Sequence, residues 1–161
     1  MKQRLGIAQA MLNNPRILIL DEPTAGLDPK ERVRFRNLIS AFAKERMVIL
    51  STHIVSDVEF IAEEIIMMKS GQIVQFGKLQ NIISEINGQV WECVVPSARA
   101  EEYAATFNTS NLRNLENNKT ALRIIADRSP MEKAVRVEPN LEDLYLFYFK
   151  GDAENDKNDS I

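Results

Sequence analysis

Two short apolar segments each end in side chains that could carry chemistry. Residues 17–20 are followed directly by Asp21 and Glu22, and residues 47–50 are followed by Ser51-Thr52-His53. Runs of branched apolar residues predict short strands that are buried on both faces. The carboxyl ends of such strands form the usual ligand crevice of an open parallel sheet, so we expect the carboxylates and the imidazole at this edge.

These residue types fit the hydrolysis of a terminal phosphate. That reaction needs a cation to screen the phosphate oxygens and a group that orients or deprotonates the attacking water. His53, the only histidine of the sequence, could donate to a γ-phosphate oxygen and sense its loss. The alternative is a structural use of these residues, with Asp21 and Glu22 capping a turn or facing water and His53 serving only the fold.

The order of the motifs resembles the second half of an ABC-transporter ATP-binding subunit. Residues 20–24, Leu-Asp-Glu-Pro-Thr, resemble the end of its Walker B strand; residues 26–29, Gly-Leu-Asp-Pro, resemble its D-loop; and residues 51–53 resemble its H-loop. The resemblance implies a role for each of four residues: a magnesium ligand (Asp21), a general base (Glu22), a catalytic switch histidine (His53) and a cofactor-binding D-loop carboxylate near a dimer interface (Asp28).

The resemblance also implies a fold class and a division of the chain. Residues 1–77 would form part of the α/β core of a P-loop NTPase, a RecA-like parallel sheet with flanking helices. Residues 78–150 would form a small α+β accessory region, in which residues 139–146 resemble a motif that closes many bacterial export ATPases. Residues 151–161 are rich in Asp and Asn and are expected to be a disordered tail.

The same resemblance implies cofactors, partners and a location. We expect ATP and Mg²⁺ as cofactors, and a second ATP-binding subunit as the partner in a head-to-tail dimer. The dimer would energise a separate membrane permease from the cytoplasmic side of the cell membrane. Neither the transported substrate nor the direction of transport follows from the sequence.

Several motifs of the complete family are missing from the sequence. A complete subunit carries a Gly-rich phosphate loop, a Q-loop and an LSGGQ-like signature before its Walker B strand, whereas no G-x-x-x-x-G-K-[ST] pattern occurs here. Residues 1–5 resemble those that directly follow Ser-Gly-Gly in the signature. Because the phosphate loop supplies the amide cradle and the lysine for the phosphates, we expect the 161-residue chain alone neither to bind ATP tightly nor to hydrolyse it.

Three interpretations of this gap stay open. The chain could be a non-catalytic fragment, one piece of an enzyme that another chain completes, or an interaction module whose accessory region binds a permease or regulator. A parallel strand buried on both faces but lacking a neighbour would expose an edge and an apolar surface. The sequence therefore also predicts that the chain self-associates.

Composition limits the class of protein. The chain has 161 residues, a hydrophobic fraction of 45% and a net charge of −3, which suits a soluble protein and gives no reason to expect nucleic acid as a partner. Cys93 is the only cysteine, so no internal disulfide can form. The N-terminus lacks the apolar core of a secretory signal, and the chain is expected to be cytoplasmic.

Local patterns predict the elements around the motifs. Apolar spacing predicts a mostly buried helix over residues 2–12. Asp28, with Pro29 and Glu31 after it, predicts the N-cap of a helix that reaches about residue 45. Its buried face would hold Phe35, Leu38, Ile39 and Phe42, and its basic residues, Arg36 among them, would be solvated.

Residues further along predict a short helix and a second set of strands. Residues 56–59 could form a capping box for a helix that ends near residue 62. A β-hairpin is expected over residues 65–76, with its turn at Ser70-Gly71. The Asn-rich segment 108–119 predicts a loop with room for one short strand, between a helix over residues 98–107 and a strand over residues 121–126.

Overall fold

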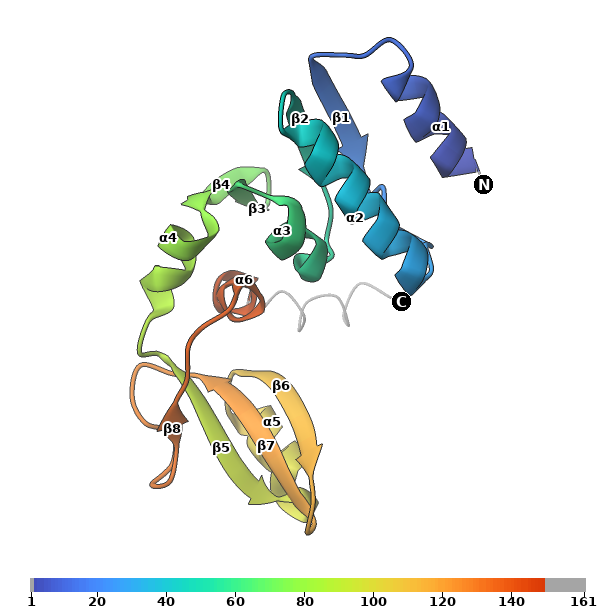
Figure 1. The fold of residues 1–161 in the computed structure, drawn as a ribbon. Helices are drawn as coiled ribbons and strands as arrows, with labels where there is room; N and C mark the ends of the chain where they lie inside the picture. Colours follow the sequence, from blue (N-terminus) through green and yellow to red (C-terminus); the bar gives the residue numbers. More distant parts are fainter. Residues whose placement is uncertain (1, 150–161) are drawn as a thin grey trace, which may run out of the picture. The chain divides into compact units, whose positions relative to one another are not determined.

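The computed structural model describes residues 2–149, which form parts of two compact units (Figure 1). The first unit ends at Glu63 and the second begins at Glu64. The predicted domain boundary at residues 77 and 78 stays a prediction, and the predicted tail, residues 151–161, lies outside the described residues. Within residues 2–149, none of the helices has the length and apolar character needed to cross a membrane.

A parallel pair of strands forms the centre of the first unit. Strand β1 (Ile17–Asp21) pairs with β2 (Met47–Ser51) in parallel, and the register places Asp21 opposite Ser51. Helix α2 (Pro29–Ala43) joins the two strands, α1 (Lys2–Met11) precedes them and α3 (Val55–Ile61) follows them. Both predicted strands and their parallel pairing are thus confirmed, as is the α/β class.

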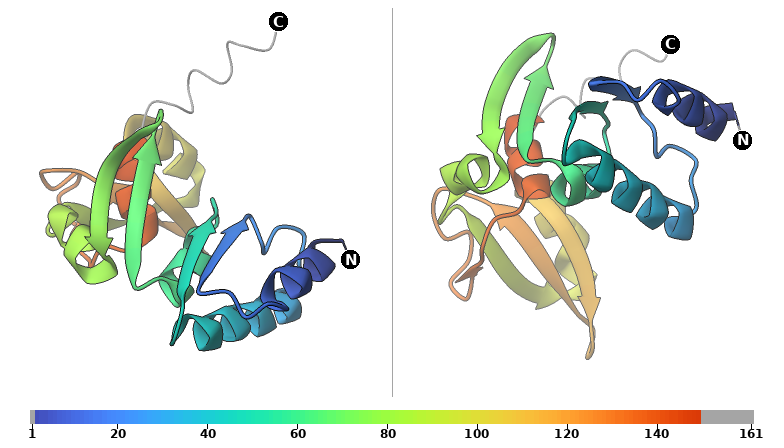
Figure 2. Two further views of the ribbon diagram at one scale, coloured as in Figure 1. Left: turned by 90° about the horizontal axis from the view of Figure 1, so that it is seen from above. Right: turned by 45° about the horizontal axis from the view of Figure 1, so that its top comes forward.

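The core of this unit lies on one face of the strand pair. Leu18 and Leu20 are buried against Phe35 and Ile39 of α2, with side chains of α1 packed around them. In the left view of Figure 2 both helices lie on the same side of the strands. The alternate residues of β1 point away from these helices, and Ile19 is 71% exposed. The prediction that β1 is buried on both faces is therefore wrong for the described residues, because one layer of helices covers only one face.

Helix α1 is also less buried than its spacing predicted. Ile7 and Met11 pack against the core, but Leu5 is 72% exposed, and Ala8 and Leu12 are exposed as well. The apolar stripe is wider than the surface that β1 and α2 offer it. The prediction of a mostly buried helix is therefore wrong for the described part of α1.

The second unit begins with the predicted β-hairpin. Strands β3 (Glu64–Lys69) and β4 (Gln72–Lys78) pair antiparallel. Ser70 and Gly71 both adopt positive φ angles, 49° and 77°, which suits the tight primed turns that match the twist of a hairpin. The predicted hairpin and the position of its turn are confirmed.

A four-stranded antiparallel sheet follows, in the order β6-β7-β5-β8. Helix α4 (Leu79–Ile83) and a short 3₁₀ turn (Ser84–Ile86) lead into β5 (Val90–Pro96). Another 3₁₀ turn (Ser97–Arg99) leads into α5 (Ala100–Thr106). The rest of the described unit comprises β6 (Thr109–Leu115), β7 (Lys119–Ile125), β8 (Val135–Arg136) and α6 (Leu141–Phe149).

Strand β6 differs most from the sequence expectation. The Asn-rich segment forms a full strand at the edge of the sheet, where polar side chains cost little because one side of the strand faces water. Asn117 and Asn118 form the turn into β7 with φ angles of 59° and 53°, a conformation that asparagine tolerates. The residues that suggested a loop are thus the turn and its edge strand.

The core of the second unit packs one face of this sheet against α5. Trp91, Cys93 and Leu122 are buried there, with Tyr103 of α5 packed against the cluster. The indole Nε1–H of Trp91 donates to the carbonyl oxygen of Ala126 at 2.8 Å, so the polar atom of this large side chain is satisfied.

Candidate active site

The parallel register brings the predicted polar residues together at one end of β1 and β2. The hydroxyl of Ser51 donates to Oδ1 of Asp21. The ladder continues one residue further, where the backbone N–H of Glu22 donates to the carbonyl oxygen of Ser51 at 2.9 Å. Asp21, Glu22 and Ser51 therefore lie at the carboxyl edge of the sheet, as the sequence predicted.

Glu22 occupies an unusual backbone conformation. Its φ angle is +43°, in the left-handed region that costs a non-glycine residue about 1–2 kcal/mol. The chain leaves the strand at this residue and enters a tight turn, in which the N–H of Ala25 bonds to the carbonyl oxygen of Glu22 at 3.2 Å. Such conformations persist only where surrounding contacts hold them, and they concentrate at functional sites.

His53 and Glu22 are directly bonded. Oε1 of Glu22 lies 2.9 Å from the backbone N of His53 and 2.8 Å from its Nδ1, and the hydroxyl of Thr52 donates to Oε2 at 3.2 Å. An ionised carboxylate can only accept hydrogen bonds, so Nδ1 carries the proton of the imidazole. The hydrogen bond from the His53 side chain is the main cause that lowers the pKa of Glu22, so Glu22 is ionised at neutral pH.

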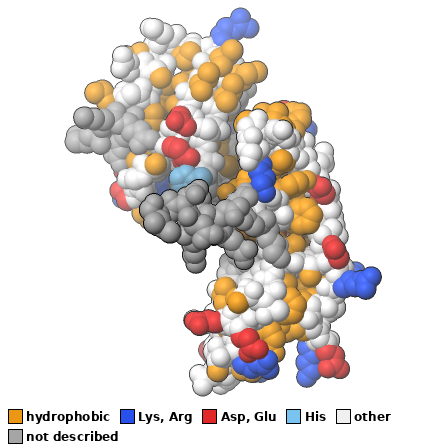
Figure 3. Space-filling view, turned by 180° about the vertical axis from the view of Figure 1, so that it is seen from behind, with side chains coloured by type: hydrophobic (Ala, Val, Ile, Leu, Met, Phe, Trp, Pro, Cys, Tyr) orange, Lys and Arg blue, Asp and Glu red, His pale blue; other side chains and the backbone are white. Residues whose placement is uncertain are grey.

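The imidazole is open to solvent. The side chain of His53 is 76% exposed, and Figure 3 shows it, in pale blue, at the surface beside acidic side chains. A ligand could therefore reach the ring while Nδ1 stays bonded to Glu22. His53 and Glu22, the predicted base, thus form one hydrogen-bonded pair, in which one residue follows β1 and the other follows β2.

Asp28 acts as the predicted helix cap. Its Oδ1 accepts the backbone N–H of Glu31 at 2.9 Å, and Pro29 takes the first position of α2. The N-cap prediction is confirmed. The predicted role of Asp28 in cofactor binding near a dimer interface stays a prediction.

Sequence reasoning missed a buried polar cluster behind the site. Asp57 and Thr24 are buried, and the hydroxyl of Thr24 donates to Oδ2 of Asp57 at 2.5 Å. The guanidinium of Arg36 donates to Oδ1 of the same carboxylate, with its Nε at 2.7 Å. We name these three residues the Thr24–Asp57–Arg36 cluster.

Two predictions about the members of this cluster are wrong. Arg36 is not solvated: its side chain is largely buried, because the paired carboxylate lies inside the unit. The predicted capping box over residues 56–59 does not form, since α3 has Ile54 as its N-cap without a side-chain hydrogen bond and Ser56 lies inside the helix. The only signal in the sequence was that Arg36 stands beside Phe35 and three positions before Ile39, at the margin of a buried face.

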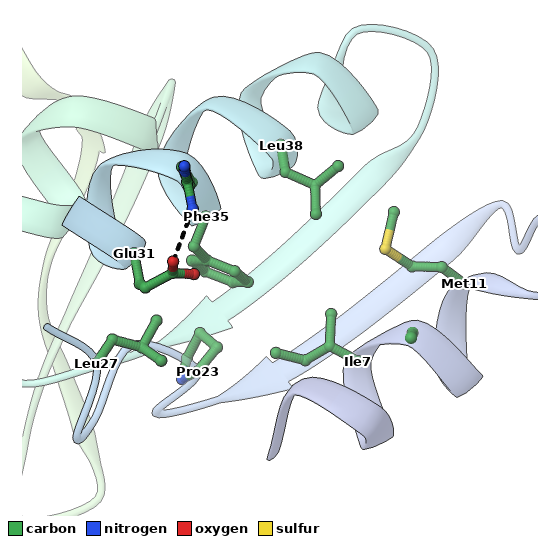
Figure 4. Close-up of a pocket in the computed structure, with 9 residues that line it drawn as sticks. Ile7, Met11, Pro23, Leu27, Glu31, Phe35 and Leu38 are labelled. Atoms are coloured by element: carbon green, nitrogen blue, oxygen red, sulfur yellow. Dashed lines mark hydrogen bonds and ion pairs between the residues drawn. The ribbon is translucent and has the colours of Figure 1, made fainter. Parts of the chain in front are cut away.

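The first unit also contains an apolar hollow of about 310 Å³ (Figure 4). Ile7 and Met11 of α1 line it together with Phe35 of α2 and the turn after β1, and Glu31 and Arg34 form an ion pair of 2.8 Å at its wall. Asp21, Glu22 and His53 are not among its lining residues. The polar site at the sheet edge is therefore distinct from this hollow.

Comparisons with known proteins agree with the motifs. The family model described as ABC transporter matches residues 1–25. An uncharacterized ABC transporter ATP-binding protein of Bacillus subtilis, YxlF, is 43% identical over 51% of this chain and 28% of its own length. The lantibiotic transport ATP-binding protein SrtF of Streptococcus pyogenes is 43% identical over 56% of this chain and 41% of its own length.

A third relative aligns with most of the chain. The Nod factor export ATP-binding protein I of Rhizobium johnstonii is 30% identical over 91% of this chain and 50% of its own length. The chain thus spans half or less of each of these three curated relatives. The family match, the relatives and the order of the motifs all support an ABC-transporter ATP-binding subunit as the kind of protein that this chain is similar to.

Proposed function

We propose that this chain supplies the hydrolytic edge of an ATP-binding site that energises a membrane permease. The observation that carries the proposal is the bond between His53 and Glu22 at the shared carboxyl end of β1 and β2. In this proposal Glu22 orients the attacking water, His53 contacts the γ-phosphate and Asp21 serves the magnesium ion. The permease and a second ATP-binding subunit are proposed partners, and the cytoplasmic face of a membrane is the proposed location.

The donor set at the edge fits magnesium that is only partly held by protein. Asp21 offers a carboxylate and Ser51 a hydroxyl, both oxygen donors of the kind that Mg²⁺ prefers. The described residues contain no group of three or more His, Cys, Asp or Glu side chains that could hold a metal ion. Mg²⁺ commonly takes one or two carboxylates and completes its shell with water and phosphate oxygens, and when bound it would screen the charge of those oxygens.

The geometry favours particular tasks for the two bonded residues. Glu22 is ionised at neutral pH, so it can accept a hydrogen bond from water, but its lowered pKa makes it a weak proton acceptor and favours orientation of the water over full proton abstraction. His53 already donates from Nδ1 to Glu22, so donation to a phosphate oxygen must come from Nε2. The doubly protonated imidazole is the form that can bond to both groups at once.

The phosphate-binding elements of the proposed site must come from elsewhere. The 161-residue sequence contains no phosphate-loop pattern, which would supply the amide cradle and the lysine for the β- and γ-phosphates. This observation favours a second candidate function, that of a module which does not bind ATP by itself and contacts a permease or regulator through residues 78–150. The two candidates differ in their response to nucleotide.

The test is Mg²⁺-ATP binding and hydrolysis by the full 161-residue chain, beside Glu22→Gln and His53→Ala. Hydrolysis that is lost in both variants, and kept in the matched surface variant Glu102→Gln, would establish an assembled site in this chain. Binding and hydrolysis that appear only after a chain with a phosphate loop is added, and that again require Glu22, would establish a shared site. No hydrolysis under either condition would overturn the proposal and favour the non-catalytic module.

A further inference from the structure

Asp57 connects the two sides of the candidate active site without belonging to it. Its carboxylate is fully buried and accepts hydrogen bonds from Thr24, two residues after Glu22, and from Arg36 in the middle of α2. Asp57 itself lies on α3, four residues after His53. One side chain therefore joins the turn that carries Glu22, the helix that follows this turn and the helix that follows His53.

Short backbone connections link each end of this contact to the active-site residues. On one side, the N–H of Leu27 bonds to the carbonyl oxygen of Thr24 at 3.1 Å and closes a second turn, which overlaps the turn that begins at Glu22. On the other side, the N–H of Asp57 bonds to the carbonyl oxygen of Ile54, the residue after His53, at 3.0 Å. A displacement of Asp57 would therefore be passed to Glu22 and His53 through only two or three residues on either side.

We propose that Asp57 is a positioning residue. It holds the turn after β1, which carries Glu22, and the segment between β2 and α3, which carries His53, at the spacing where the hydrogen bond between Glu22 and His53 forms. Its meaning for catalysis rests on the proposed function, but the positioning itself does not. Glu22 lies in a strained left-handed conformation, so it needs a contact that keeps its turn in place. The Thr24 hydroxyl provides that contact, and Arg36 balances the buried charge that the contact requires.

The single histidine makes this proposal measurable without nucleotide. The ¹⁵N shifts of an imidazole distinguish a ring that is protonated at Nδ1 from one that is protonated at Nε2. The bond to Glu22 requires the Nδ1–H form, so we expect the wild-type chain to show it at a pH well above the ordinary range of histidine. The measurement uses the full ¹⁵N-labelled chain, and a Glu22→Ala sample, which removes the side-chain acceptor at this position, assigns the pattern of a released ring.

Four variants separate positioning from a merely structural role. Asp57→Asn and Thr24→Val should shift His53 from the Nδ1–H pattern to the Nε2–H pattern. Thr24→Ser keeps the hydroxyl, so it should keep the wild-type pattern. Asp143→Asn is the matched control, since Asp143 is also fully buried beside an arginine and a serine but lies in the second unit. This control should leave the His53 pattern unchanged.

The outcomes are decisive in either direction. If Thr24→Val and Asp57→Asn keep the Nδ1–H pattern, the cluster does not position the site and the proposal fails, whatever their stability. If Asp57→Asn does not fold, Thr24→Val and Thr24→Ser carry the test, because the exchange of Thr for Val removes one hydroxyl and no charge. A failure of ATP hydrolysis in the wild type, both alone and with a phosphate-loop chain added, would contradict the proposed function but not this result, since no nucleotide is present in the NMR measurement.

Discussion

Each unit of the molecule contains a buried aspartate held by an arginine and a hydroxyl. In the first unit Asp57 accepts from Thr24 and Arg36. In the second, Asp143 accepts from the hydroxyl of Ser110 at 2.7 Å and from Arg123 at 2.9 Å (Nε to Oδ1) and 2.7 Å (Nη2 to Oδ2). Both aspartates are fully buried, so each charge depends on its partners.

The two clusters differ in what they hold. Asp143 also exchanges two hydrogen bonds of 2.9 Å with Asn140, so the two residues together cap α6, while Arg123 ties that helix to β7. Its partners belong to a regular sheet and to one helix. Asp57 instead joins a turn to two helices, and its helix begins without a side-chain cap. A buried aspartate paired with an arginine and a hydroxyl thus docks α6 in the second unit and holds the turn after β1 in place in the first.

The largest expected effects come from breaking each cluster. Asp143→Ala should lower the free energy of unfolding of the second unit by about 3–5 kcal/mol, because Arg123 would keep its charge without a partner. Urea unfolding followed by the fluorescence of Trp91, the only tryptophan and a buried residue of this unit, measures the loss. Asp57→Ala should cost the first unit a similar amount, measured by the urea dependence of the His53 NMR signal.

A double variant sharpens this prediction. Replacing both members of the pair, Asp143→Leu with Arg123→Met, should cost less than Asp143→Ala alone, because no buried charge is left unpaired. An equal or larger cost in the double variant would show that the carboxylate acts through its bonds to Ser110 and Asn140 and not through the ion pair.

The two faces of β1 give the next largest contrast. Leu18 is buried between the helices, so Leu18→Ala should lower the free energy of unfolding by about 2–5 kcal/mol. Ile19 points to the other face, and Ile19→Thr should change it by no more than about 0.5 kcal/mol. The same His53 signal in urea measures both. Comparable costs for the two variants would mean that something covers the outer face of β1 in solution.

This contrast also marks the limit of the sequence prediction. β1, β2, the cap at Asp28 and the hairpin turn at Ser70-Gly71 were predictable because each depends on neighbours in the sequence. The burial of only one face of β1 was not predictable, since it depends on which helices or strands pack against each face. The bonds from Asp57 to Thr24 and Arg36 span 33 and 21 residues, and no local pattern indicates such pairs.

The candidate site shows the same limit. The sequence predicted that Glu22 and His53 share a sheet edge, because both follow apolar strands of one parallel sheet. It did not predict the direct bond between them, which depends on the left-handed conformation of Glu22. The length of strand β6 was underestimated because its polar composition suggested a loop, whereas its pairing with β7, which lies later in the sequence, makes it a strand.

A smaller effect is expected at the start of α2. Asp28→Ala should lower the free energy of unfolding of the first unit by about 1 kcal/mol, because the N–H of Glu31 would lose its acceptor. Asp28→Ser should retain most of the stability, since serine also caps helices well. Thermal unfolding of the three proteins, followed by circular dichroism, compares them. A cost well above about 2 kcal/mol would indicate that Asp28 does more than cap α2 in this chain.

The smallest expected effect is a pH dependence of stability, which differs between the two units. Burial, with the nearby charge of Glu92 as a lesser cause, raises the pKa of Cys93 above its ordinary value of 9.0. The neutral thiol is therefore favoured in the folded state, so its contribution to stability is complete below pH 9.0 and declines as the pH rises through the folded-state pKa. Unfolding of the second unit, followed by Trp91 fluorescence from neutral to alkaline pH, should show this loss, and Cys93→Ala should reduce the slope. Identical alkaline slopes in the two proteins would show that Cys93 does not titrate differently in the folded and unfolded chains.

In the first unit, the pKa shift of Glu22 has the opposite sign. The pKa of Glu22 is lowered, so its contribution should be lost at acid pH, as the pH falls through its folded-state pKa, and Glu22→Gln should remove that dependence.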